Sequence, residues 1–440
     1  MTKFKFMYKW QTGGNDEPAH QYTMADFALR VGNVNLMLNE NIWSRTICDS
    51  VVLSAYPLAM WLASSWWRLN WEPLPAHGIY PSLDWRMAHE LGAADHGFVW
   101  PRIILASDGD MIQVWAGPVH DHENQSVRYL NELETPAFIP LLDFQREAED
   151  FVTTVLNRLD ATNCSDTDLA NLWRLIQTDQ AEQQSVRYRR LEATMGYDPD
   201  ECIKDVMDKV LELENRMGED ALSELIPIYG RTKPLTDIEE IADSNGLTGT
   251  PEIEISDSLV EQGMPWQRAV AAARSLRQAI GNVDSMLDDA DLSGLLGLRA
   301  HDVEKWTPGK RNDAALAVPM SGSQYKFIPR KRHPLTKRFE LARFIGDSIL
   351  TEPTNEQWLT STDLSTSRQK FQRAFAAEFL CPIAALRDFL DDDFSESAIE
   401  DAVEHFQVSE TTVKSLLTNN RLIPFVSMSD YNDGRLPYHL

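Results

Sequence analysis

The sequence contains few cysteines for its length, and no pattern of them that suggests a metal knuckle or a disulfide framework. The four cysteines (Cys48, Cys164, Cys202 and Cys381) lie far apart, without a CxxC pair. We therefore expect reduced and mostly buried thiols. No stretch reaches the roughly 18 uncharged apolar residues that a membrane span needs, and the N-terminal MTKFKFMYKWQTGG lacks the apolar core of a signal peptide. These absences favour a cytoplasmic protein with no membrane partner.

Positive charge is also scarce. The chain has 41 Lys and Arg against 67 Asp and Glu, which gives a formal net charge of -26. Because contacts to phosphate need a basic surface, this balance disfavours direct binding of nucleic acid. A basic protein partner, or solubility alone, explains the charge better. Disorder is disfavoured as well, since 43% of the residues are hydrophobic and 13 are Trp.

The chain, at 440 residues, is long enough for two or three domains. We predict an α+β protein of three segments, of which the first, residues 1–145, is a Trp-rich α+β domain. A helix is predicted over Pro57–Leu69, and a β-hairpin around Asp108-Gly109. We expect the tryptophans of this domain to form a core or a partner-binding surface and no cofactor site; they include Trp61, Trp66, Trp67, Trp71, Trp85 and Trp100.

The second segment, residues 146–230, has apolar residues three and four apart with charged residues between them. This spacing predicts an acidic helical connector. Residues 229–251 are rich in Gly, Pro, Thr and Asp, so we place the main domain boundary there. The third segment, residues 252–440, is predicted to be mainly helical with a small sheet.

Three blocks of the third segment follow one another in a recognisable order. They read FELARFIGD (Phe339–Asp347), FAAEFLCP (Phe375–Pro382) and AVEHFQVS (Ala402–Ser409). Over about residues 260–424 this layout resembles the ImmA/IrrE-type metallopeptidases. In that family a helix reading F-x-L-A-H-E-x-G-H is followed by F-A-A-x-L-x-x-P and then by A-x-x-F-x-V-S. The resemblance implies a zincin-like fold for the C-terminal domain.

The zinc motif itself is replaced. In the family two His at i and i+4 bind the zinc and a Glu between them is the general base; those positions are Arg343, Asp347 and Phe344 here. The glutamate of the second helix falls on Gln369 or Phe371. A guanidinium does not ligate zinc and Phe cannot accept a proton. We therefore predict no catalytic residue, no metal and no other cofactor at this site, so that the chain is not a working protease.

Arg343 and Asp347 carry opposite charges at i and i+4. On a helix such residues lie on one face, and they would either form a buried ion pair across the space of the missing metal or an ordinary surface pair.

Two histidine-containing segments resemble metal sites by chance. AHELG (residues 88–92) supplies His89 and Glu90, but the next histidine, His96, follows seven residues after His89. That spacing is roughly 10 Å of helical rise, too far for both rings to reach one ion. These three residues are the weaker alternative for a metal site. His120 and His122 would share one face of a strand, although two His in an acidic loop are more often simply solvated.

One run of the chain concentrates positive charge. It comprises Arg330, Lys331, Arg332, His333, Lys337 and Arg338. Without interleaved aromatic residues it is interpreted as a solvated or internally neutralised loop in preference to a phosphate site. Residues 395–423 resemble a helix-turn-helix, but the second helix offers only Lys414 and Arg421 as basic residues, which favours a structural role.

The sequence thus predicts a non-catalytic, ImmA/IrrE-like regulatory or interaction protein. The resemblance implies a setting in bacterial stress response, toxin–antitoxin modules or anti-phage defence, and a protein partner that is basic or carries a helix-turn-helix. Two alternatives stay open: an active zinc metallopeptidase with displaced ligands, and a DNA-binding transcriptional regulator.

Overall fold

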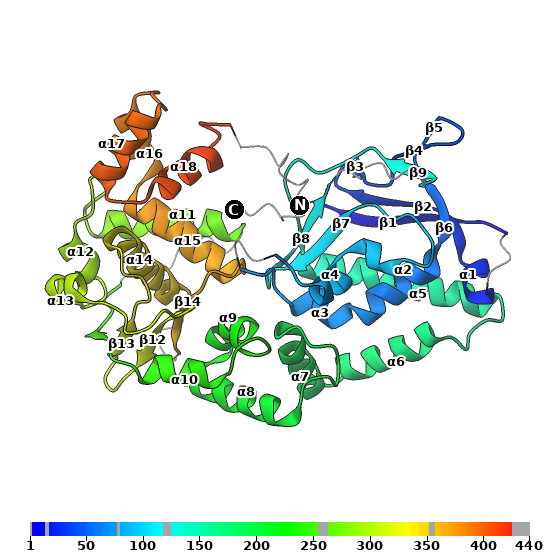
Figure 1. The fold of residues 1–440 in the computed structure, drawn as a ribbon, viewed down its shortest axis with the longest axis horizontal. Coiled ribbons are helices and arrows are strands. Elements are labelled where there is room, and N and C mark those ends of the chain that lie inside the picture. Colours follow the sequence, from blue (N-terminus) through cyan, green and yellow to red (C-terminus); the bar gives the residue numbers. More distant parts are fainter. Residues whose placement is uncertain are drawn as a thin grey trace. The chain divides into compact units, whose positions relative to one another are not determined.

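A computed structural model describes residues 2–13, 17–76, 80–117, 125–253, 263–351 and 357–424. The chain divides into an N-terminal unit that runs to Ile203 and a C-terminal unit that begins at Lys204. Both units combine helices with small antiparallel sheets, which confirms the α+β class (Figure 1). Within the described residues, no helix is long and apolar enough to cross a membrane.

The N-terminal unit begins with strands and ends with helices. Its strands are β1 (Phe4–Trp10), β2 (Met24–Val31), β3 (Val34–Asn35), β4 (Asn39–Asn41), β5 (Thr46–Cys48), β6 (Val51–Ser54), β7 (Ile103–Ser107), β8 (Met111–Ala116), β9 (Val127–Tyr129) and β10 (Ala137–Pro140). Its helices are α1 (Pro18–Tyr22), α2 (Ala55–Ser64), α3 (Trp66–Trp71), α4 (Leu83–His89), the 3-10 turn η1 (Leu91–Ala94), α5 (Leu141–Ala161), α6 (Asp168–Gln180) and α7 (Gln183–Thr194).

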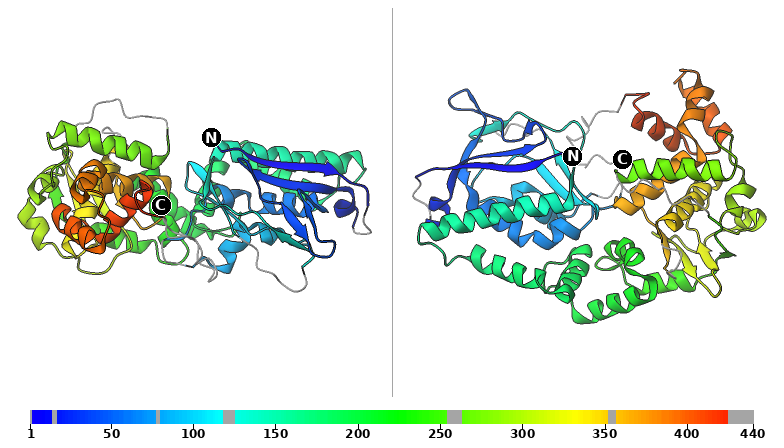
Figure 2. Two further views of the ribbon diagram at one scale, coloured as in Figure 1. Left: turned by 90° about the horizontal axis from the view of Figure 1, so that it is seen from above. Right: turned by 180° about the vertical axis from the view of Figure 1, so that it is seen from behind.

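Three small antiparallel sheets organise these strands. One has the order β1-β2-β3 with β6 also paired to β2, the second is β10-β8-β7 and the third is β5-β4-β9. The predicted hairpin is present as β7 and β8, with Ser107 opposite Ile112 and Gly109 at a φ of 100° that favours glycine. Helix α5 packs along β1, as both views in Figure 2 show.

The helix predicted over Pro57–Leu69 is broken in two at Ser65. The backbone of Ser65 leaves helical geometry with ψ at 5°, and the next helix starts at Trp66. The hydroxyl of Ser64 donates to the carbonyl oxygen of Trp61 at 3.1 Å. Serine side chains compete in this way for backbone partners, so two consecutive serines are a weak point in a helix.

Tryptophan forms much of the N-terminal core. Trp61, Trp66, Trp67, Trp85 and Trp100 are all less than 8% exposed. Trp66 meets Trp173 of α6 edge to face, with ring centroids 5.4 Å apart. For these five residues the core interpretation is correct, and the apolar faces of α5 and α6 close over the same core.

The boundary between the two units differs from the expected segments 1–145, 146–230 and 252–440. Helices α5, α6 and α7 belong to the N-terminal unit, whereas the chain from Lys204 onward belongs to the C-terminal unit. The stretch expected to be a connector is therefore shared between two cores. Amphipathic helices have the same apolar periodicity whichever core they cover, so the sequence pattern could not assign these helices to one unit or the other.

The C-terminal unit is mainly helical. Its helices are α8 (Lys204–Met217), α9 (Glu219–Tyr229), α10 (Thr236–Asp243), α11 (Pro265–Ala279), α12 (Asp289–Gly294), α13 (Ala300–Lys305), α14 (Pro334–Leu350), α15 (Ser367–Leu380), α16 (Ile383–Leu390), α17 (Glu396–Phe406) and α18 (Glu410–Asn419). One antiparallel sheet has the order β11 (Leu247–Gly249), β13 (Tyr325–Ile328), β12 (Ala315–Pro319) and β14 (Leu359–Ser361).

Helices α14 and α15 form the centre of this unit. α15 lies between α11 and α14, and α14 also contacts β14 (Figure 1). The two helices approach closely at Gly346, where an added Cβ would lie 3.0 Å from the Phe375 ring. A larger residue at this crossing would require the Phe375 ring to shift by a few tenths of an ångström, so glycine suits the position for its small size and not for its backbone freedom.

The terminal helix pair packs onto the same unit. α18 contacts α17 and α15, and its Val413 and Leu417 are fully buried. Ser409 caps α18 by accepting a hydrogen bond from the amide of Thr412 at 3.2 Å. The pair is therefore packed onto the hydrophobic core of the C-terminal unit.

Trp66 provides a direct test of the aromatic core. We expect Trp66→Ala to lower the free energy of unfolding by about 3 to 5 kcal/mol, because it leaves a cavity beside Trp173. Trp43, which is 80% exposed, is the matched control, and Trp43→Ala should change stability by less than about 0.5 kcal/mol. Urea unfolding followed by circular dichroism measures both, and equal stabilities for the two variants would refute the assignment.

Candidate functional site

The residues at the expected zinc-motif positions lie on the most buried part of α14. The helix starts at Pro334, whose fixed φ suits a first helical position. Arg343 is 4% exposed, and Phe344 and Asp347 are 0% exposed. A surface ion pair on an amphipathic helix is therefore excluded.

Arg343 binds neutral oxygens at the start of α15. Its Nη2 donates to the carbonyl oxygen of Thr362 at 2.5 Å and to the Gln369 side-chain carbonyl. The same Gln369 oxygen accepts the amide of Thr362 at 2.9 Å. The residues at the expected first and third ligand positions thus contact each other directly.

Asp347 has a separate set of partners. Its carboxylate accepts hydrogen bonds from Arg368 Nε at 2.6 Å, from Gln372 Nε2 at 2.6 Å and from the amide of Thr360 at 2.8 Å. The expected pair between Arg343 and Asp347 is therefore wrong. Arg368 reaches Asp347 from a neighbouring helix, and β14 adds a backbone donor, so Asp347 is satisfied without Arg343.

The two phenylalanines at motif positions belong to the apolar core. Phe344 meets Phe327 of β13 edge to face at 5.5 Å, and Phe371 stacks with Phe375 at 6.4 Å. Of the two positions considered for the third ligand, Gln369 lies beside Arg343, and Phe371 packs in the core.

Burial without a carboxylate partner changes the electrostatics of Arg343. Its hydrogen-bond acceptors among the described residues are the two oxygens of Thr362 and Gln369. Burial, followed by the nearby positive charges of Arg373 and Arg330, lowers the pKa of Arg343 to about 9. Arg330, by contrast, pairs with Glu340 at 2.9 Å and with Asp363 at 2.6 Å.

These residues do not fit a zinc ion. Guanidinium and carboxamide groups stand where two ligands would be needed, and the single carboxylate, Asp347, already accepts three hydrogen bonds. Across the described parts of the chain, no group of three or more His, Cys, Asp and Glu is placed to hold a metal ion.

Glu224 of α9 is part of this buried region and was not anticipated. Both of its carboxyl oxygens accept from the Thr366 hydroxyl, at 2.8 and 2.9 Å. Burial raises the pKa of Glu224 to about 7, against the lowering effects of Thr366 and Arg368. A carboxyl set among Leu222, Leu225 and Ile226 is the signal in the sequence that could have identified it.

The alternative metal residues of the N-terminal unit have other partners. His89 is fully buried, with Nδ1 2.8 Å from the Leu105 carbonyl oxygen and Nε2 3.0 Å from a Glu72 oxygen. Glu90 binds Arg86 through two hydrogen bonds of 2.7 and 2.9 Å. His96 instead lies beside the ring of His20, with centroids 5.1 Å apart. The three residues are not brought together, and His120 and His122 lie outside the described residues.

The basic run is used mostly inside the protein. Lys337 donates to the carbonyl oxygens of Val303 and Trp306 at 2.8 and 2.9 Å, which caps α13. Arg338 pairs with Asp289 and also donates to the Leu287 carbonyl oxygen at 2.6 Å. Arg330 and Arg338 pair with acids inside the protein, as the interpretation of an internally neutralised segment predicts, and Lys337 is buried against carbonyl oxygens. Arg332 and His333 are exposed.

Comparisons with family models, with curated proteins and with solved structures find no match to this chain. The resemblance to ImmA/IrrE-type peptidases therefore depends on the motif residues alone.

The observed partners of Asp347 predict its contribution to stability. Asp347→Ala removes the carboxylate that Arg368 contacts inside the protein, so we expect a loss of about 3 to 5 kcal/mol in the free energy of unfolding. In double-mutant cycles, the coupling between Asp347 and Arg368 should exceed that between Asp347 and Arg343. Urea unfolding of the single and double alanine variants measures both couplings, and the reverse order would contradict the hydrogen-bond assignment.

Glu224 predicts a dependence of stability on pH. Its folded pKa is about 7 and its ordinary value is 4.5, so the folded state binds the proton more tightly. Glu224 therefore contributes about 3 kcal/mol to the free energy of unfolding below about pH 4.5, and this contribution is lost as the pH rises to about 7. Glu224→Gln should abolish this part of the slope in unfolding experiments between pH 5 and pH 7.5. Parallel stability curves for parent and variant would argue against a raised pKa.

Proposed function

We propose that this chain is a non-catalytic, ImmA/IrrE-like regulatory or interaction protein in which a buried polar network takes the place of a metal centre. The observation that supports the proposal best is the hydrogen bond between Arg343 and Gln369, the residues at the expected first and third ligand positions. A guanidinium there supplies its own positive charge, so the site needs no cation.

The network is suited to a structural role. It joins α14, β14 and α15 through Arg343, Asp347 and Gln372, and Gln372 also donates to the Thr360 carbonyl oxygen at 2.8 Å. Among the described residues, Arg343 Nε and Gln372 Oε1 have no hydrogen-bond partner, and the other hydrogen bonds of the network hold the three elements together. A rigid surface built on such a framework suits recognition of another protein.

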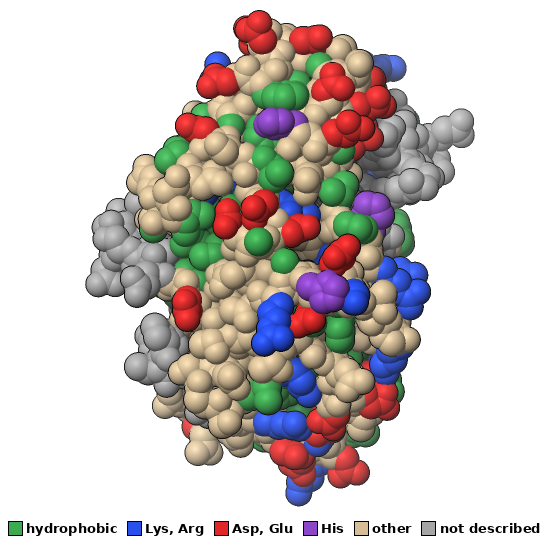
Figure 3. Space-filling model, turned by 90° about the vertical axis from the view of Figure 1, so that its left-hand side faces the viewer, with side chains coloured by type: hydrophobic (Ala, Val, Ile, Leu, Met, Phe, Trp, Pro, Cys, Tyr) green, Lys and Arg blue, Asp and Glu red, His purple; other side chains and the backbone are tan. Residues whose placement is uncertain are grey.

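The two alternative functions find less support. An active metallopeptidase would need ligands that His89, Glu90 and His96 do not supply together. A DNA-binding role for the terminal helix pair conflicts with charge, because Lys414 already pairs with Glu396 at 3.1 Å and with Glu410 at 2.7 Å. Acidic side chains also gather at the upper end of the face in Figure 3, where α16 and α17 lie in Figure 1.

A protein partner, basic or with a helix-turn-helix, is therefore part of the proposal. The bacterial setting of stress response, toxin–antitoxin modules or anti-phage defence comes by analogy with the family.

Metal analysis tests the proposal. We expect purified protein to carry far less than one zinc per chain after dialysis, because the donors at the site are already engaged. The combined variant Arg343→His, Phe344→Glu and Asp347→His should gain neither zinc nor proteolysis. About one zinc per chain retained by the parent protein, or zinc-dependent proteolysis by the variant, would overturn the proposal.

A matched pair of variants separates loss of folding from loss of a site. Phe344→Glu places a carboxylate against Phe327 and should destabilise strongly, whereas Phe344→Leu keeps an apolar side chain and should cost about 1 kcal/mol. Circular dichroism on both variants shows whether a negative proteolysis result comes from a folded protein.

A further inference from the structure

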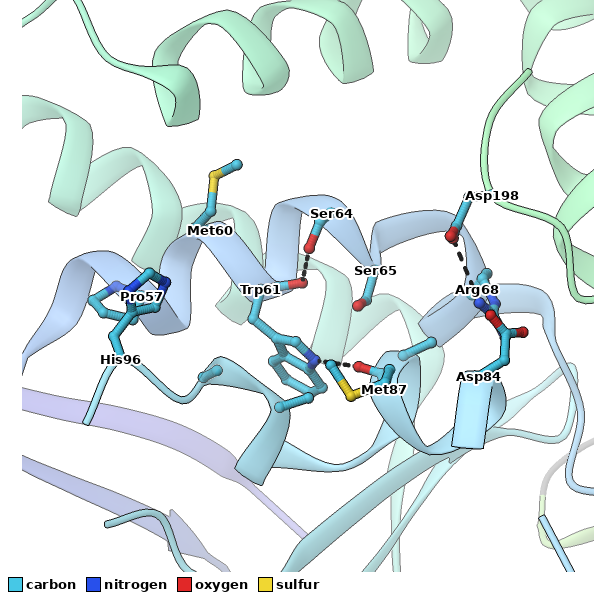
Figure 4. A pocket seen from close by; sticks show the side chains of 13 residues that line it. Pro57, Met60, Trp61, Ser64, Ser65, Arg68, Asp84, Met87, His96 and Asp198 are labelled. Carbon is cyan, nitrogen blue, oxygen red and sulfur yellow. Dashed lines mark hydrogen bonds and ion pairs between the residues drawn. The ribbon is translucent and has the colours of Figure 1, made fainter. Parts of the chain in front are cut away.

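The N-terminal unit contains a cavity of about 300 Å³ between α2, α3, α4 and η1. Figure 4 shows it as elongated, with Pro57 and His96 at one end and Arg68, Asp84 and Asp198 at the other. This volume lies at the lower end of the range for ligand sites, which suits one long side chain or a small molecule.

The middle of the cavity is apolar. Met60, Trp61 and Met87 line it, and the Trp61 indole is held in place by a hydrogen bond of 2.9 Å from Nε1 to the Met87 carbonyl oxygen (Figure 4). Methionine side chains adapt to the shape of what they contact. This stretch therefore suits the aliphatic stem of a ligand.

The charged end has more carboxylates than cations. Arg68, only 3% exposed, pairs with Glu72 at 2.7 Å, with Asp84 at 2.9 Å and with Asp198 at 3.6 Å. Of these acids, Asp84 and Asp198 line the cavity, and their side chains are 48% and 45% exposed. Burial raises the pKa of Asp198, and the negative charges of Glu201, Asp84 and Glu72 add to that effect while Arg68 opposes it.

The layer beneath does not remove the excess negative charge. His89 Nε2 lies 3.0 Å from the same Glu72 oxygen that Arg68 contacts. Arg68 and His89 thus share the Glu72 carboxylate in the layer beneath, and the two acids that line the cavity, Asp84 and Asp198, outnumber its arginine.

An apolar rim adjoins the cavity. Met87, which lines it, is 54% exposed, and Leu83, four residues earlier on α4, is 71% exposed. Tyr80, just before this helix, is 53% exposed. Residues at i and i+4 share one helix face, so Leu83 and Met87 form a continuous apolar edge beside the acidic end.

We propose that this cavity is a docking site for a Lys or Arg side chain of a basic partner protein. The stem of the side chain would lie along Met60 and Met87, its charged head would meet Asp84 and Asp198, and neighbouring apolar residues of the partner would cover Leu83. Lys and Arg combine an apolar stem with a charged head in this way. The chain's formal charge of -26 favours such a partner at longer range.

An anionic ligand is the less suitable occupant. Arg68 is the cation that lines the cavity, and its contacts with Glu72, Asp84 and Asp198 leave it surrounded by negative charge. The inference concerns the N-terminal unit and holds whether or not the C-terminal unit is a zinc-free relative of the peptidases.

Peptide binding to the full-length protein tests the proposal. The probe is the peptide acetyl-Leu-Arg-Leu-amide, and its control has citrulline in place of Arg, with the same shape and no charge. Isothermal titration calorimetry at low salt should show the Arg peptide binding about tenfold more tightly than the citrulline peptide, the ratio that one modest ion pair provides. Added salt should reduce this difference.

Variants assign the binding to the cavity. Asp198→Asn and Asp84→Asn should each weaken binding of the Arg peptide severalfold, whereas Asp150→Asn, an exposed acid of α5 outside the cavity, should leave it unchanged. Circular dichroism confirms that each variant is folded. The proposal would be overturned if the Arg peptide did not bind, or if it bound no more tightly than the citrulline peptide. It would also be overturned if a peptide with Glu in place of Arg bound more tightly, or if Asp198→Asn and Asp84→Asn left the affinity unchanged.

Discussion

The buried carboxylate of Asp347 sets the arrangement of the C-terminal unit. It is completely removed from solvent, and a carboxylate in that position costs several kcal/mol unless donors surround it. The donors come from two other elements, the amide of Thr360 on β14 and the side chains of Arg368 and Gln372 on α15. α14, β14 and α15 must therefore occupy one relative position. Arg343, Gln369 and Glu224 take their places around that junction.

Local patterns in the sequence predicted the elements better than their partners. The turn at Asp108-Gly109 and the helices of the three motif blocks follow from turn chemistry and apolar periodicity, which act over a few residues. The side-chain partners of Asp347, which are Arg368 and Gln372, are separated from it by 21 and 25 residues in the chain. A spacing rule such as i and i+4 predicts a pair with the nearest opposite charge on the same helix. It contains no information about a donor that folding brings from another helix.

The residues around Glu224 show a second limit of the sequence. Residues 146–230 have the composition of a solvated acidic connector, yet Glu224 is buried against Thr366, 142 residues away. The clue was an acid among apolar neighbours at helical spacing. The polar stripe of Arg368, Gln369 and Gln372 on a helix otherwise rich in Phe and Ala was a similar clue that an acceptor had to face it. In each of these two helices, the informative residues were the polar ones that stand among apolar neighbours.

The protein presents nearly all of its negative net charge to its surroundings, because cations and acids are buried in similar numbers among the described residues. Arg68, Arg330, Lys337, Arg338 and Arg343 are all 7% exposed or less, whereas acids such as Asp288 and Glu396 are exposed. Acids are buried as well, among them Glu72, Glu192, Glu224, Glu340, Asp347 and Glu378, so within the described residues burial removes about as much negative as positive charge from the surface. The outer shell therefore keeps nearly the whole negative net charge of the chain. Repulsion within such a shell opposes compaction, and dissolved salt screens it. The folded chain therefore gains stability from moderate ionic strength, a dependence opposite to that of a protein held together by exposed ion pairs.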